Sequence, residues 1–576
     1  MNRLMKFLET DFLSLALAKF REIPKVYVRS FVIIFLAINA AFAYHTFYFM
    51  WGDHDWGRII INSPKLFFTS YGRFSAFLHF SLLTGNNILP VLTNLYAFAA
   101  LAFSSVLLCI YWKVPKSTLY YSIIGILLYT QPYTLTWLSY AHLSLTQYGL
   151  PFLVISALIF SERSALCDKR WRIIAYLCSA IFLNTLAFGT YMPVLNTLAV
   201  VFIGRLIVDV FRGEGGIFVV VKGILFRQRY TFLTIALGAL FFEAIFLILK
   251  NNGFIDTTYY SLQTVGIKNF IPHLMSISYK AFRILWHYPV TFFPNVLVRL
   301  WTSLFIFGVF SVIVNVFVGG GGQCDRKTRI IKSVSLLALF LLIVIFSKTA
   351  AIIATHSSTI YEPRILFFGD PFLHVFPIAL IFIQRFNFPK TIAILISIVL
   401  LNICLIYDAK ALKVWKFDFE AQKMLWNRVM TRIEGNENYD ASKKYELLFV
   451  GDAPSYDIHY YGNNNRRNKE NEFKRDSGIS KFNTGILRSH SRAFYFFFPD
   501  LFARNYRELS WLLKQNKKSR YYEQAQSIKK TALKLKTQIN DMRAYPHKNS
   551  VLIKDDVIII VFSESELNEV KKILNK

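Results

Sequence analysis

The chain has 576 residues, of which 54% are hydrophobic, 17% aromatic and 17% charged. The charged fraction is lower than the roughly 25% of an average soluble protein, so an ordinary soluble globular enzyme is excluded. The formal net charge of +30 would suit a nucleic-acid-binding protein. No base-stacking module or recognition motif accompanies this charge, and much of it lies in short loops between apolar segments, so we exclude that class as well.

Apolar runs of about 20 residues, the length that a helix needs to cross a bilayer, recur up to residue 407. Backbone groups in lipid have to be hydrogen-bonded within their own segment, so these runs are predicted to be transmembrane helices. We predict about eleven spans, preceded by an amphipathic interfacial helix at residues 4–20. The spans cover residues 30–50, 88–112, 118–138, 145–161, 173–190, 192–208, 230–249, 300–318, 333–354, 371–384 and 390–407.

Basic residues are distributed unequally between the two sets of connecting loops. The short loops near residues 139–144 and 191 carry no Lys or Arg. The positive-inside rule therefore places the basic loops and the N-terminus in the cytoplasm, and an odd number of spans places the C-terminus on the other side. The basic set consists of Lys113, Lys116, Arg163, Lys169, Arg170, Arg172, Arg212, Lys222, Arg227, Arg229, Arg326, Lys327, Arg329, Lys332, Arg385 and Lys390.

The composition changes after residue 407, where the chain becomes charged and rich in Lys, Asn and Tyr. We predict a polytopic α-helical membrane domain at 1–407 and a C-terminal α/β domain at 408–576. None of the five cysteines falls in the C-terminal domain, so we expect no disulfide framework there. The expected elements of this domain are helices at 419–433 and 509–542, strands at 445–451 and 557–562, and a polar loop at 462–476.

A compact polar motif, Gly-Asp-His-Asp-Trp-Gly-Arg, follows the first span directly, at residues 52–58. It contains two carboxylates, Asp53 and Asp55, an imidazole and a guanidinium. An ordinary polar loop with an interfacial Trp is the alternative to a functional site. The outer position of Arg58 and Arg73 runs against the positive-inside trend and favours the functional interpretation. A carboxylate there can act as a general base, and an Arg can bind phosphate.

Two later outer segments carry weaker signals. Glu362 and Arg364 lie in a short outer loop, where a structural ion pair and phosphate binding are about equally supported. The long loop at 250–299 interleaves aromatic and basic residues, for which membrane anchoring is favoured over sugar stacking. The glycine run at 319–322 lacks the Gly-Lys-Ser/Thr ending of a phosphate-binding loop and is interpreted as a turn.

Together these features resemble the serotype-converting O-antigen glucosyltransferases of Gram-negative bacteria and their phages, which belong to the glycosyltransferase C superfamily. The resemblance covers nearly the whole chain through short motifs. Relatives often have adjacent carboxylates where this chain has His54-Asp55. The matching features are the cytoplasmic N-terminus, Asp55-Trp56-Gly57-Arg58, Gly72-Arg73, Pro363-Arg364 before a late span, and a helix that leads to the Leu-Leu-Phe-Val-Gly strand at 447–451.

The resemblance implies a glycosyltransferase domain at 1–407 in the bacterial inner membrane and a periplasmic domain at 408–576. It implies a polyprenyl-phosphate-glucose donor, an O-antigen or lipid-linked glycan acceptor, and transfer with inversion at the anomeric carbon. We expect no cofactor and no metal ion. The implied roles are general base for Asp55, with Asp53 as second choice, binding of the donor phosphate for Arg58, Arg73 and Arg364, and substrate contacts for His54, Trp56 and Glu362.

Three alternatives stay open at this point. A transporter or flippase of lipid-linked sugars would place paired charges within the spans, in repeated halves, and no repeat is visible here. An acceptor-binding or scaffold protein of envelope assembly would rely on the C-terminal domain. A related transferase could use another sugar or another acceptor.

Overall fold

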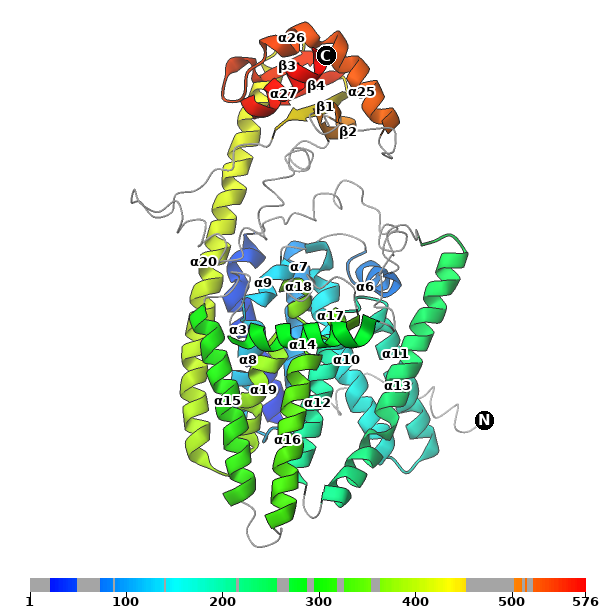
Figure 1. Ribbon diagram of the computed structural model, residues 1–576, viewed down its shortest axis with the longest axis vertical. Helices are drawn as coiled ribbons and strands as arrows, with labels where there is room; N and C mark the ends of the chain where they lie inside the picture. Colours follow the sequence, from blue (N-terminus) through cyan, green and yellow to red (C-terminus); the bar gives the residue numbers. More distant parts are fainter. Residues whose placement is uncertain are drawn as a thin grey trace. The chain divides into compact units, whose positions relative to one another are not determined.

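The computed structural model of the chain is mostly helical (Figure 1). It describes residues 21–48, 73–85, 89–138, 141–213, 217–255, 269–286, 295–318, 326–353, 363–451, 502–509, 513–514 and 522–575. The predicted helix at 4–20 and polar loop at 462–476 lie outside the described residues. Two compact units divide the chain: residues 1–47, 64–137 and 143–408 form the first, and residues 48–63, 138–142 and 409–576 form the second.

Nine helices in the described part of the chain are long and apolar enough to cross a membrane, which fits a polytopic membrane protein. Each of them overlaps a predicted span. They are α3 (Lys25–Phe47), α7 (Pro90–Tyr111), α10 (Ala141–Leu166), α11 (Arg170–Phe188), α12 (Val194–Arg212), α13 (Ile217–Asn251), α15 (Asn295–Val318), α16 (Arg326–Phe346) and α20 (Asn387–Glu434).

The two remaining predicted spans, 118–138 and 371–384, coincide with shorter helices. These are α8 (Thr118–Tyr129), with 12 residues, and α19 (Asp370–Ile383), with 14 residues. At 1.5 Å per residue they are about 18–21 Å long, less than the bilayer core of about 30 Å. Helix α8 is shorter than predicted because Pro132 has no N–H to continue it, and the chain resumes as α9 (Tyr133–Leu138).

Helix α19 lies inside the bundle. Each of its residues is buried apart from the half-buried His374, and it packs against α8, α12 and α15. A Cβ atom on Gly308 of α15 would lie 2.8 Å from the Cβ of Pro377, so the glycine permits the close approach of the two helices. The packing places Asp370, the first residue of α19, in the protein interior.

The predicted loop at 250–299 contains a helix, α14 (Phe270–Trp286). It crosses α15 and α16 instead of running alongside them (Figure 1). Ile277, Ala281 and Ile284 form its buried face, whereas Ile271 and Met275 are exposed. An amphipathic helix of this kind is typical of a membrane–water boundary.

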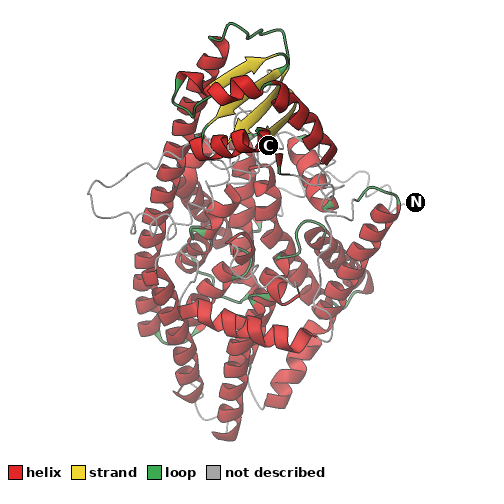
Figure 2. Ribbon diagram, turned by 45° about the horizontal axis from the view of Figure 1, so that its top comes forward, coloured by secondary structure: helices red, strands yellow, loops and turns green. Residues whose placement is uncertain are grey.

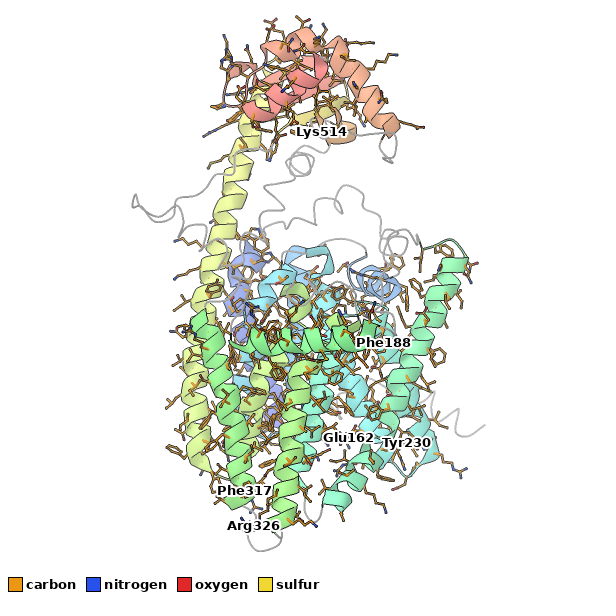
Figure 3. The ribbon with its side chains drawn as sticks, viewed as in Figure 1. Glu162, Phe188, Tyr230, Phe317, Arg326 and Lys514 are labelled. Carbon is orange, nitrogen blue, oxygen red and sulfur yellow. The ribbon has the colours of Figure 1, made fainter. Side chains whose placement is uncertain are left out.

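A group of charged side chains lies where the end of α7 meets α10 and α12, in the half of the bundle that contains Glu162 and Arg326 (Figure 3). The Arg205 guanidinium contacts the carboxylate of Glu162 and the carbonyl oxygen of Tyr111, and its Nε donates to Asp209 Oδ2 at 3.2 Å. Lys113 Nζ lies 2.9 Å from Asp209 Oδ1. Each buried charge therefore has a charged partner, which offsets its loss of hydration.

Arg205→Met is expected to lower the free energy of unfolding by about 3–5 kcal/mol, because Glu162 and Asp209 would lose a buried countercharge. Thermal unfolding of the detergent-solubilised chain measures the change. Arg326→Met, on an exposed side chain, is the matched control and should stay within about 0.5 kcal/mol of wild type. Equal midpoints for the two variants would contradict a stabilising role of the cluster.

The second unit contains a four-stranded sheet in the order β2–β1–β4–β3, covered by helices (Figure 2). Strand β1 is parallel to both of its neighbours, and β3 and β4 pair antiparallel. The strands are β1 (Tyr445–Val450), β2 (Phe502–Glu508), β3 (Val551–Lys554) and β4 (Val557–Val561), of which β1 and β4 coincide with the predicted strands.

Alternate residues of β1 face opposite sides of its sheet. Leu447 and Phe449 pack with Trp426 of α20, whereas Leu448 and Val450 pack with α25 (Tyr522–Lys534), α26 (Lys536–Asp541) and α27 (Glu564–Leu574). The helix that we predicted over 509–542 corresponds to two helices, α25 and α26, and residues 510–512 and 515–521 of that range lie outside the described residues. Strands β2 and β3 were not predicted.

Candidate functional site

Only two of the eight predicted site residues, Arg73 and Arg364, belong to the described part of the chain. Arg73 immediately precedes α6 (Phe74–Thr84), and Arg364 lies in the short helix α18 (Pro363–Leu366). The remaining predicted site residues, Asp53, His54, Asp55, Trp56, Arg58 and Glu362, lie outside the described residues.

Arg73 is anchored at the turn between α11 and α12. Its guanidinium carbon lies 4.8 Å from the centre of the Tyr191 ring, a cation–π distance. The Ser75 backbone N–H donates to the carbonyl oxygen of Gly189 at 3.3 Å. A Cβ atom on Gly189 would lie 2.5 Å from the Phe74 ring, so the glycine leaves room for this ring where α6 docks.

An aromatic cluster connects this turn to the segment that follows α18. Tyr191, Trp137 and Phe368 contact one another, with ring centres 5.4 to 6.0 Å apart. Aromatic pairs at such distances stabilise by about 0.5–1.5 kcal/mol each beyond their burial. The cluster thus brings Arg73 and the α18 segment, nearly 300 residues apart in sequence, to one region of the bundle.

A buried ion pair lies next to this cluster. The Lys348 ammonium pairs with the Asp370 carboxylate, and both side chains are 3% exposed. The hydroxyl of Tyr133 donates to Asp370 Oδ2 at 3.0 Å. Neither Lys348 nor Asp370 was among the predicted site residues. The signal for Lys348 was an ionisable residue inside the predicted span 333–354, which by default indicates a functional position.

His374 follows Asp370 by one helical turn and has a defined tautomer. Gln131 Nε2 donates to the Leu127 carbonyl oxygen at 3.0 Å, and its Oε1 lies 2.9 Å from His374 Nδ1. Because an amide oxygen only accepts, His374 Nδ1 carries a proton, and in the neutral ring Nε2 is an acceptor. The imidazole stacks on the Trp301 ring, with the two ring centres 5.0 Å apart.

A small cavity lies between this polar group and α14, lined by Tyr133, Trp301, Ser347, Lys348, Asp370 and His374. Its volume is about 20 Å³, which is room for one or two water molecules and too little for a sugar. A sugar would therefore have to bind outside this cavity.

Labelled residues identify the two ends of the bundle. Arg326 lies at one end, and Phe188, close to the turn that holds Tyr191, lies toward the other (Figure 3). Helices α6, α9 and α18 gather at the second end (Figure 1). The second end places the Arg73 guanidinium beside aromatic side chains, a combination suited to a phosphorylated sugar.

Comparison with known proteins adds one match. The family model described as Glucosyl transferase GtrII matches residues 53–376, more than half of the chain. No curated protein and no solved structure matches the chain. The matched range begins at the polar motif after the first span and ends within α19, and it includes Arg73, Tyr191, Lys348 and Asp370. The chain belongs to the GtrII glucosyl transferase family.

Proposed function

We propose that the chain is a membrane glucosyltransferase that moves glucose from polyprenyl-phosphate-glucose to the O-antigen of lipopolysaccharide, on the periplasmic side of the inner membrane. The observation that carries the proposal is the family match at 53–376. This range encloses the Asp53–Arg58 motif as well as Arg73 and Arg364, so the residues to which we assign the chemistry all belong to the matched part of the chain.

In the proposed reaction an acceptor hydroxyl attacks the anomeric carbon of glucose from the side opposite the phosphate. Asp55, or else Asp53, takes the hydroxyl proton as the new glycosidic bond forms. The bond between the anomeric carbon and the phosphate oxygen breaks, and the polyprenyl phosphate leaves with the electron pair. The configuration at that carbon is inverted.

The three arginines are assigned to the leaving phosphate. Arg58, Arg73 and Arg364 would neutralise the charge that grows on it in the transition state, the kind of electrostatic stabilisation that contributes most in many enzymes. The docking of α6 against the α11–α12 turn supports this assignment for Arg73. His54, Trp56 and Glu362 would contact the sugar or the acceptor.

The proposed topology follows from the loops. The end of the bundle with Arg326 would face the cytoplasm, and the end with α6 and α18 would face the periplasm. Residues 1–407 would then form the glycosyltransferase domain, and residues 408–576 would form a periplasmic domain.

A transporter of lipid-linked sugars is the second candidate, and the Lys348–Asp370 pair is the observation that favours it. Ionisable residues buried within membrane helices often mark transport pathways. The family match favours the transferase, because its members are described as glucosyl transferases.

The mass of lipopolysaccharide from cells with and without the gene tests the proposal. We expect modified O-antigen units to be one hexose heavier when the gene is present. Isolated membranes supplied with polyprenyl-phosphate-glucose and acceptor on the same side should give the same product. If the acceptor mass stayed unchanged in that assay while the labelled donor moved between leaflets, the transporter would be the correct function.

A further inference from the structure

Two backbone segments, residues 347–350 and 365–370, lie against each other between α16 and α19. We call these two segments the paired stems. The Lys348–Asp370 ion pair connects them. A Cβ atom on Gly369 would collide with the carbonyl oxygen of Ser347, so the stems approach as closely as a glycine allows.

Asn196, in the first turn of α12, bridges the paired stems. Its Nδ2 donates to the carbonyl oxygen of Ile365 at 3.3 Å, and its Oδ1 accepts from the backbone N–H of Ala350 at 2.8 Å. The neighbouring Thr197 Oγ1 donates to the Phe368 carbonyl oxygen at 2.6 Å. Asn196 is 1% exposed, so water cannot replace these hydrogen bonds if the side chain is lost.

The turn that leads into α12 also holds Arg73, through the stacking of its guanidinium on Tyr191. Six residues of one chain segment, from Tyr191 to Asn196, therefore connect the anchor of Arg73 to the anchor of α18, which carries Arg364. A clamp built from two arginines needs its members placed to within about 0.5 Å. The segment at the start of α12 contacts both anchors, so it can set that spacing.

We propose that Asn196 is a positioning residue of the transferase, which fixes α18 and its Arg364 relative to Arg73. The inference rests on the proposed function, in which both arginines bind the donor phosphate. Asn196 acts through the backbone of α18, so its loss should matter only while Arg364 is present to be positioned.

A double-mutant cycle tests this inference in the full-length chain in membranes, with polyprenyl-phosphate-glucose as donor. Asn196→Leu is expected to lower kcat/KM about 10- to 100-fold, as small misplacements of binding groups do. In an Arg364→Ala background the same substitution should cost about twofold or less, since the group that it positions is gone. An equal cost in both backgrounds would overturn the inference.

Asn184→Leu is the matched control. Asn184 is another Asn with 1% exposure, on α11, and its Oδ1 has no hydrogen-bond partner in the described part of the chain. We expect it to leave kcat/KM within about twofold of wild type. If Asn196→Leu does not fold, Asn196→Asp replaces it in the cycle. The Asp side chain keeps the shape of Asn but its carboxylate cannot donate to Ile365. We expect the same pattern of costs in the two backgrounds.

Amide hydrogen exchange separates failure of this inference from failure of the proposed function. Exchange in α17 (Thr349–Ile353) and α18 should be at least about tenfold faster in Asn196→Leu and unchanged in Asn184→Leu. If wild type transferred no glucose but this difference appeared, the proposed function would be wrong and the anchoring by Asn196 correct. If exchange were unchanged, the positioning role would be refuted whatever the activity.

Discussion

Asp55→Asn is expected to lower the rate of glucosyl transfer by about 10²- to 10⁴-fold, the usual contribution of a general base. The amide has nearly the same shape as the carboxylate but cannot take the acceptor proton. Initial rates in membranes with polyprenyl-phosphate-glucose and O-antigen acceptor measure the effect, normalised to the amount of the chain in the membrane.

Asp53→Asn is the control for this experiment, because it makes the same change two residues away in the same motif. We expect a smaller loss for Asp53→Asn than for Asp55→Asn. The reverse order would make Asp53 the base. Full transfer by the Asp55→Asn variant would show that Asp55 is not the base.

The long helices of the first unit were predictable because lipid leaves the chain little choice. A run of apolar residues in a bilayer has to be helical, so its ends lie close to the ends of the run. The span predicted at 173–190 corresponds to α11 (Arg170–Phe188), and the span at 300–318 corresponds to α15 (Asn295–Val318). Strand β1 was predictable for a similar reason, since a short apolar run with both faces buried is typical of a parallel sheet.

Elements with mixed polarity were missed. Helix α14 carries Lys280 and Arg283, so it does not read as a span, although Ile277, Ala281 and Ile284 recur at helical spacing. Strand β2, with the sequence Phe-Ala-Arg-Asn-Tyr-Arg-Glu, lies at the edge of the sheet and has little apolar content. Its pairing with β1 depends on a partner more than 50 residues away, which local pattern does not show.

The support of the candidate site could not be predicted because its contacts connect distant parts of the chain. Tyr133 and Asp370 are separated by 237 residues, and Asn196 and Ile365 by 169. No local spacing links such residues. The short motifs with Arg73 and Arg364 identified two segments near each other, but the Asn196 and Lys348 contacts that hold them required the fold.

Lys348→Met is expected to lower the free energy of unfolding by about 3–5 kcal/mol, because it leaves the Asp370 carboxylate buried with the Tyr133 hydroxyl but without its cation. Thermal unfolding of the solubilised chain measures this loss. The opposite single change, Asp370→Asn, would leave the Lys348 ammonium without its countercharge and should be destabilising to a similar degree.

The double variant Lys348→Met/Asp370→Asn should recover most of the lost stability, because it removes both charges together and keeps an acceptor for Tyr133. Replacing a whole buried ion pair by neutral groups of similar volume is often neutral or stabilising, since both desolvation costs disappear. Two single losses that simply added in the double variant would mean that Lys348 and Asp370 act independently. Recovered stability with lost transfer would instead mean that the charged pair is needed for the reaction as well as for the paired stems.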